Sequence, residues 1–146
     1  AAGGSWFLDL PRKAQLRSVE RFEQLPIAIE VESAAGLVGL LHADSPFADW
    51  AVLRSSLQLD DDPEVRKVCQ WSRRRLKQGD TEQVQGLRAL LVGHTPVLEA
   101  KRLGNVWHLD TGGWAGGHFT LMDMRTLRLV SPGPDAAPAP QPISPA

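Results

Sequence analysis

The stretch LRALLVGHTPVLEAKRLGNVWHLDTGG, residues 87 to 113, decides the fold of this chain. It contains two short apolar runs, Leu87–Val92 and Val106–Leu109, which are rich in branched residues and are followed by glycine or small polar residues. Runs of this length with such endings are typical of buried strands. In α/β proteins, sites gather at the carboxyl ends of strands. The stretch therefore predicts an α/β fold with chemistry where these strands end.

Two histidines hold the same position relative to a predicted strand. His94 follows the run Leu87–Val92, inside a Gly-His-Thr-Pro turn, and His42 follows the apolar run Leu37–Leu41. Glycine lets the backbone turn and proline prevents a strand or helix from continuing, so we expect His94 to be presented at the strand end. A lone histidine is more often a structural group than a ligand, but neutral imidazole binds divalent transition metals. The repeated placement makes both residues metal-ligand candidates.

The other two histidines lack such support. His108 lies inside a predicted strand, and His118 follows a Gly-Gly turn. Both are predicted to be structural. The acids Asp44 and Asp49 are predicted to be solvated or to cap local structure.

Hydrophobic periodicity and capping signals predict the remaining elements. Residues 1 to 130 are expected to form one domain. Residues 131 to 146 contain six of the eleven prolines and are expected to be a disordered Pro/Ala-rich tail. The expected helices cover residues 11 to 23, 46 to 59 and 62 to 77, and the expected strands cover residues 27 to 32, 37 to 41, 118 to 124 and 127 to 130.

Composition excludes several classes of function. The chain has 146 residues and a net charge of −1, which gives no field to attract nucleic acid or an anionic membrane surface. No apolar run approaches the roughly 18 residues of a membrane span, and the first residues, Ala1–Gly4, lack the basic and apolar regions of a signal peptide. A single cysteine fits a reducing compartment. We therefore expect a cytoplasmic protein without nucleic-acid or membrane partners.

Taken in order, the motifs of the chain resemble the PPP-type, calcineurin-like metallophosphoesterases, in particular the bacterial and bacteriophage-type serine/threonine protein phosphatases. Three amino-terminal motifs of that family, Gly-Asp-x-His, Gly-Asp-x-x-Asp-Arg-Gly and Gly-Asn-His-Glu, do not occur. The resemblance implies the carboxy-terminal half of a sandwich of mixed β-sheets flanked by helices, with the amino-terminal half missing. It covers residues 3 to 130 and rests on Gly3–Phe7, Leu25–Pro26, Leu41–Asp44, Trp71–Arg73, Gly93–Pro96 and Asp110–Gly112.

The resemblance implies metal-dependent hydrolysis of phosphoserine and phosphothreonine by the intact enzyme. It implies that His42 and His94 bind metal and that Arg73 holds phosphate, for which a planar guanidinium is suited. Asp44 and Asp110 are candidates to orient an imidazole. Two divalent ions are implied, manganese first, with iron or zinc as alternatives. The implied partners are a phosphorylated protein substrate and the missing amino-terminal half.

Two alternatives stay open at this point. The chain is either half of an enzyme or a catalytically dead remnant that serves as a binding or scaffold module. Hydrolases of dinucleoside polyphosphates are a second alternative, although we expect Trp-Ala after Gly-His in those enzymes, where this chain has Thr95 and Pro96. The isolated chain is expected to be inactive and to expose the runs Leu37–Leu41 and Leu87–Val92, which favours aggregation.

Overall fold

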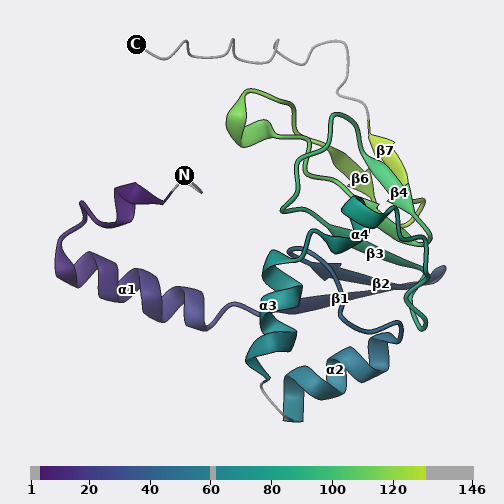
Figure 1. The fold of residues 1–146 in the computed structure, drawn as a ribbon, viewed down its shortest axis with the longest axis horizontal. Helices are drawn as coiled ribbons and strands as arrows, with labels where there is room; N and C mark the ends of the chain where they lie inside the picture. Colours follow the sequence, from purple (N-terminus) through teal and green to yellow (C-terminus); the bar gives the residue numbers. More distant parts are fainter. Residues whose placement is uncertain (1–3, 60–61, 131–146) are drawn as a thin grey trace.

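Five strands form one mixed sheet at the centre of the molecule (Figure 1). The computed structural model describes residues 4–59 and 62–130, so the predicted disordered tail at residues 131 to 146 lies outside the described residues. The strand order is β1-β2-β3-β5-β4, with β2, β3 and β5 parallel and with both outer strands antiparallel to their neighbours. The strands are β1 Ala28–Ser33, β2 Gly36–Leu41, β3 Ala89–Val92, β4 Lys101–Leu103 and β5 Val106–His108.

Strand β3 shows why this sequence forms a central strand. All four of its residues are buried, as the continuous apolar run predicts for a strand covered on both faces. Successive side chains point to opposite faces, so Leu90 and Val92 join one hydrophobic cluster while Ala89 and Leu91 join the other. The prediction of an α/β fold with a mixed sheet is confirmed.

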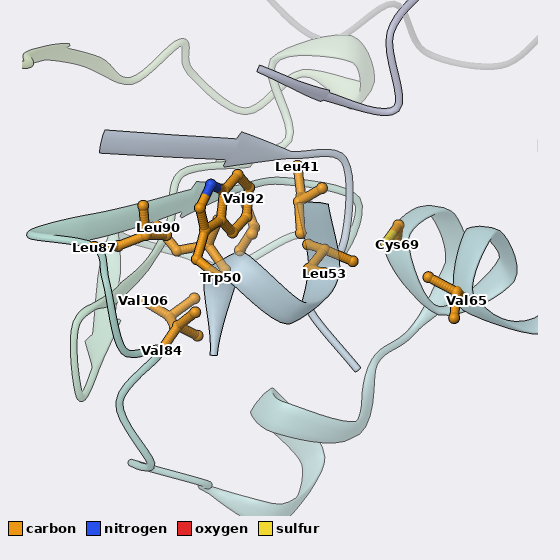
Figure 2. Close-up of a cluster of buried hydrophobic side chains, with 10 residues drawn as sticks. All are labelled: Leu41, Trp50, Leu53, Val65, Cys69, Val84, Leu87, Leu90, Val92 and Val106. Atoms are coloured by element: carbon orange, nitrogen blue, oxygen red, sulfur yellow. The ribbon is translucent and has the colours of Figure 1, made fainter. Parts of the chain in front are cut away.

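Helices cover one face of this sheet and a hairpin covers the other. Helices α2 (Trp50–Leu59) and α3 (Pro63–Trp71) contribute Trp50, Leu53, Val65 and Cys69 to the first cluster, which Figure 2 shows. The two-stranded sheet of β6 (Leu121–Asp123) and β7 (Arg128–Val130) lies over the second cluster. The expectation that the runs Leu37–Leu41 and Leu87–Val92 lie exposed is wrong, because these two layers cover them.

The local sequence explains where α3 begins and ends. The Asp62 carboxylate accepts a hydrogen bond from the Glu64 backbone N–H at 2.8 Å, and Pro63 occupies the first turn, as capping rules predict. The helix was predicted to run on to Lys77, and this is wrong. Ser72 adopts an extended conformation that ends α3 at Trp71, and a separate short helix, α4, covers Arg74–Gln78.

Helix α1 (Arg12–Glu23) matches its prediction to within one residue but contributes no residue to either hydrophobic cluster. None of its residues is buried, and the helix extends away from the sheet (Figure 1). Helix α2 begins at Trp50, four residues later than predicted, after Asp49 has capped the Ala51 N–H at 2.7 Å. Two short 3-10 helices cover Ser5–Phe7 and Gly113–Ala115. Across residues 4–59 and 62–130, no helix has both the length and the apolar character needed to cross a bilayer.

Candidate functional site

Two parallel strands bring His42 and His94 together. Strands β2 and β3 are neighbours, and beyond their ends the Gly93 N–H donates to the His42 carbonyl at 3.0 Å. The imidazoles therefore lie at the same edge of the sheet. His42 Nε2 and His94 Nδ1 are 3.0 Å apart, and the ring centroids are 4.9 Å apart. The structure thus places next to each other two residues that are 52 positions apart in the chain.

The backbone at His94 is strained. Its φ is 65°, in the left-handed region that side chains other than glycine rarely adopt. The following N–H, of Thr95, donates back to the Gly93 carbonyl at 2.7 Å, which tightens the turn. Such conformations cost of order 1–3 kcal/mol and cluster at functional sites. The turn directs the imidazole toward His42 and against the ring of Trp71, whose centroid is 5.5 Å away in an edge-on arrangement.

The surroundings of His94 favour its neutral form. Partial burial is the largest cause that lowers the pKa of His94, and the nearby His42 and Arg73 lower the pKa further. The backbone of Trp71 and the carboxylate of Asp110 oppose this shift. Neutral imidazole is the form that binds a metal. His94 is therefore held in a ligand-competent state at neutral pH.

The donor atoms fit a divalent metal in part. Two nitrogens that bind one metal at ~2.1 Å lie roughly 3.0 to 3.4 Å apart, and the His42–His94 nitrogens have this spacing. The other ring nitrogen of His94, Nε2, is buried without a hydrogen bond to the described residues. Within residues 4–59 and 62–130, no set of three or more His, Cys, Asp or Glu side chains gathers to hold a metal. The described chain thus offers two converging imidazoles as a partial donor set.

Arg73 lies beside this pair of imidazoles. It occupies the link between α3 and α4, with φ −118° and ψ 9°, and it is close enough to lower the pKa of His94. A narrow recess next to the site is lined by Arg73, Thr95, Asp44 and His108, among others. Arg73 thus lies near enough to His94 to act on its charge, and His94 in turn lies next to His42.

Asp44 does not have the surroundings predicted for it. Only 2% of the residue is exposed, and its carboxylate Oδ1 accepts hydrogen bonds from the Ser45 N–H and from Arg75 Nε, both at 2.9 Å. The prediction that Asp44 is solvated is wrong because the carboxylate belongs to a buried ion pair, while its bond to the Ser45 N–H agrees with the local role that was the alternative. Its hydrogen bonds in the described part of the chain go to Ser45 and Arg75, so Asp44 holds neither imidazole.

Sequence reasoning missed Arg75 at this site. The sequence predicts one helix over residues 62 to 77, and in that helix Arg75 is one of several cations near the end, without a distinct role. The break at Ser72 starts a new helix, whose orientation buries Arg75. Nothing in the run Arg73-Arg74-Arg75 distinguishes the third arginine from its neighbours, so the burial of Arg75 could be found only from the tertiary structure.

Asp110 lies after the end of β5, where the sequence predicts it. Its Oδ1 accepts the Gly112 N–H at 3.0 Å, which shapes the Asp-Thr-Gly turn, and its carbonyl accepts the Val97 N–H at 2.9 Å. The carboxylate also raises the pKa of His94, although other causes outweigh it. The interaction with His94 is thus electrostatic, and the role of Asp110 in orienting an imidazole stays a prediction.

His108 is the last residue of β5 and is only 3% exposed. Both of its ring nitrogens lack hydrogen-bond partners among the described residues. Burial lowers the pKa of His108 most strongly; Asp44 opposes this shift, while Arg75 and Lys101 add to it. The folded state therefore favours the neutral ring, whereas an unfolded histidine titrates near its ordinary pKa of ~6.5.

This difference predicts a loss of stability in acid. Below pH ~6.5 the unfolded chain binds a proton at His108 before the folded chain does, so the free energy of unfolding falls as the pH falls toward the lowered pKa. Urea unfolding at pH 7.5 and pH 5.5 measures this loss. Glutamine cannot take up this proton, so the His108→Gln variant should lose less stability than the wild type between pH 7.5 and pH 5.5. An equal loss in both proteins would contradict a lowered pKa at His108.

The buried Cys69 thiol is expected to react slowly with alkylating agents. Burial, followed by the charge of Asp44, raises the pKa of Cys69 to about 11, so the reactive thiolate is rare at pH 8. Mass spectrometry should show little carbamidomethylation by iodoacetamide in the native chain and complete reaction in urea. Fast alkylation of the native protein would show that Cys69 is accessible.

Comparison with known proteins adds a second, independent observation. No protein-family model matches the chain. The chain is 31% identical over 124 residues to serine/threonine-protein phosphatase 1 of Salmonella typhimurium, a match that spans 82% of this chain and 52% of the relative. It is 27% identical over 129 residues to serine/threonine-protein phosphatase 2 of the same organism, spanning 84% of this chain and 56% of the relative.

This similarity indicates a phosphatase relationship. The chain spans about half the length of the curated relatives it matches. The expected resemblance to serine/threonine phosphatases is thus supported in general terms, because both relatives are serine/threonine-protein phosphatases. The α/β fold with its mixed sheet and helices is compatible with such a protein.

Proposed function

We propose that this chain supplies His42, His94 and Arg73 to a metal-dependent phosphomonoesterase of the serine/threonine protein phosphatase type. The observation that carries the proposal is the 3.0 Å approach of two imidazole nitrogens at parallel strand ends, with Arg73 beside them. The similarity to two named phosphatases supports the choice of reaction.

Each residue has a task that its surroundings allow. His42 and His94 would hold one of two divalent ions, manganese first, with iron or zinc as alternatives. Bound metal polarises a phosphoryl oxygen and lowers the pKa of water. The surroundings of His94 keep that ring neutral and free to act as a ligand. Arg73 would hold two phosphate oxygens through its planar guanidinium.

The partners follow from the same proposal. The substrate would be a phosphorylated protein, and the remaining metal ligands would come from an amino-terminal half of the same domain. The shorter span of this chain relative to its matched relatives supports that division. Catalytic zinc sites typically have three protein ligands, so two imidazoles alone should not sustain catalysis. We therefore propose that residues 1 to 146 alone have no useful phosphatase activity.

The experiment compares this chain with a longer protein in which the proposed amino-terminal half precedes it. Both are incubated with Mn²⁺ and para-nitrophenyl phosphate, a serine-phosphorylated peptide or a dinucleoside polyphosphate. We expect the longer protein, and not residues 1 to 146, to hydrolyse para-nitrophenyl phosphate and the phosphopeptide. Turnover of the dinucleotide alone would favour the other hydrolase class. The absence of metal-dependent turnover in both proteins would contradict the proposed function and favour a binding or scaffold module.

Arg73→Lys should lower kcat/KM and weaken inhibition by phosphate in the longer protein. Lysine keeps the charge but loses the two-pronged geometry, so we expect a loss of about tenfold or more, corresponding to a good hydrogen bond to a charged group. Steady-state kinetics with added phosphate measure both effects. Arg74→Lys is the matched control, because Arg74 pairs with Asp80 in an exposed ion pair at 3.1 Å. Unchanged constants for Arg73→Lys would rule out the phosphate contact.

A further inference from the structure

The buried pair of Asp44 and Arg75 connects the two segments that carry the proposed site. Asp44 comes two residues after His42, and Arg75 comes two residues after Arg73. Arg75 Nε and Asp44 Oδ1 are 2.9 Å apart, and 4% and 3% of the two side chains are exposed. The pair therefore fixes the end of β2, with its imidazole, against the link between α3 and α4, with its guanidinium.

The second arm of the Arg75 guanidinium holds a third segment. Nη1 donates to the Glu82 carbonyl at 2.8 Å and to the Asp80 carbonyl at 3.4 Å, both in the loop after α4. The planar fork thus bonds to a carboxylate on one side and to backbone carbonyls on the other. A lysine has a single nitrogen on a flexible stem and cannot reproduce this geometry.

Further hydrogen bonds lock the Asp44 side of the pair. The Ala43 N–H donates to the Cys69 carbonyl of α3 at 2.7 Å, and the Ser45 N–H donates to Asp44 Oδ1 at 2.9 Å. The residues that follow His42 are therefore tied both to α3 and to the ion pair. Displacing Arg75 would release the carboxylate that orders this segment.

General stability gives little reason to bury such a pair. Desolvation of two charges offsets much of their attraction, and well-packed apolar residues are often as stable in the same place. The directional hydrogen bonds of such a pair instead hold the two segments that carry it in a fixed relative position. We propose that Arg75 is a positioning residue that acts through Asp44 to set the place of Arg73 relative to His42 and His94. This inference rests on the proposed phosphatase function.

Arg74 provides a control within the same turn. It also pairs with Asp80, at 3.1 Å, but 56% of its side chain is exposed. Among the described residues, no hydrogen bond joins Arg74 to residues 42 to 45. Arg74→Lys and Arg75→Lys therefore make the same chemical change at adjacent positions, one outside the buried network and one inside it.

Kinetics of the longer, metal-loaded protein test the positioning role. Arg75→Lys should lower kcat/KM for para-nitrophenyl phosphate about 10- to 100-fold, because a small misplacement of an aligned group has effects of this size. Arg74→Lys should change it little. Since Arg75 acts largely through the placement of Arg73, the loss in the double variant Arg73→Lys/Arg75→Lys should be clearly smaller than the product of the two single losses. Multiplying losses in the double variant would overturn the proposal.

Amide hydrogen exchange on residues 1 to 146 tests the geometry without catalysis. Arg75→Lys should accelerate exchange at Ala43 and Ser45, whereas Arg74→Lys should not. If Arg75→Lys fails to fold by circular dichroism, the neutral double variant Asp44→Asn/Arg75→Met replaces it with the same expectation. Unchanged exchange at both amides would overturn the positioning role. Accelerated exchange together with an inactive wild-type form of the longer, metal-loaded protein would instead contradict the phosphatase function and leave the fixing of this segment supported.

Discussion

Replacing His94 with alanine is expected to weaken divalent-metal binding about 10- to 100-fold or more. Loss of a group that merely orients a ligand costs this factor, and a direct ligand matters at least as much. The effect should be large because His94 Nδ1 lies 3.0 Å from His42 Nε2, the spacing of two nitrogens that share one metal. Isothermal titration of Mn²⁺ or Zn²⁺ into the longer protein measures the affinity.

The other two histidines are the controls for this result. His118 is exposed on the loop before β6, and His108 is buried in β5 without a place in the imidazole pair. Neither His118→Ala nor His108→Ala should change the metal affinity by more than a few-fold, provided that the His108 variant stays folded at the titration temperature. Equal losses from His94→Ala and either control would show that the assignment of ligands is wrong.

Leu90→Ala should lower the free energy of unfolding by about 2–5 kcal/mol. Leu90 is fully buried in the central strand β3, and its removal leaves a cavity between the sheet and the helices. Urea denaturation followed by circular dichroism measures the change.

The matched control for this core substitution is Leu98→Ala. The Leu98 side chain lies on a loop and is 95% exposed, so we expect a change within about 0.5 kcal/mol. A small effect at Leu90, comparable to that at Leu98, would mean that the sheet core is not packed as described.

Periodicity and local signals were enough to locate most elements. The branched apolar runs predict β2, β3 and β5 because strands buried on both faces need such residues. Asp62 and Pro63 predict the start of α3 because a carboxylate cap and a proline in the first turn are local in sequence. Strand β4 was missed: its three residues, Lys101–Leu103, are short and mostly charged, and only pairing with β5 makes them a strand.

The site was predictable where it depends on strand ends and unpredictable where it depends on distant partners. Placing His42 and His94 after parallel strands is enough to bring them to one edge of a sheet. The burial of Asp44 is different, because its partner Arg75 is 31 residues away in sequence and becomes available only after α3 stops at Ser72. A charge pair of that separation leaves no periodic pattern.

The isolated position of α1 has a consequence for how the chain unfolds. A helix of 12 residues is marginal in water without tertiary contacts, and none of the residues of α1 is buried. We therefore expect its melting to be uncoupled from that of the sheet, whose strands and helices share two hydrophobic clusters. The cooperative unit is expected to begin near β1, with residues 12 to 23 exchanging between helix and coil while the sheet stays native.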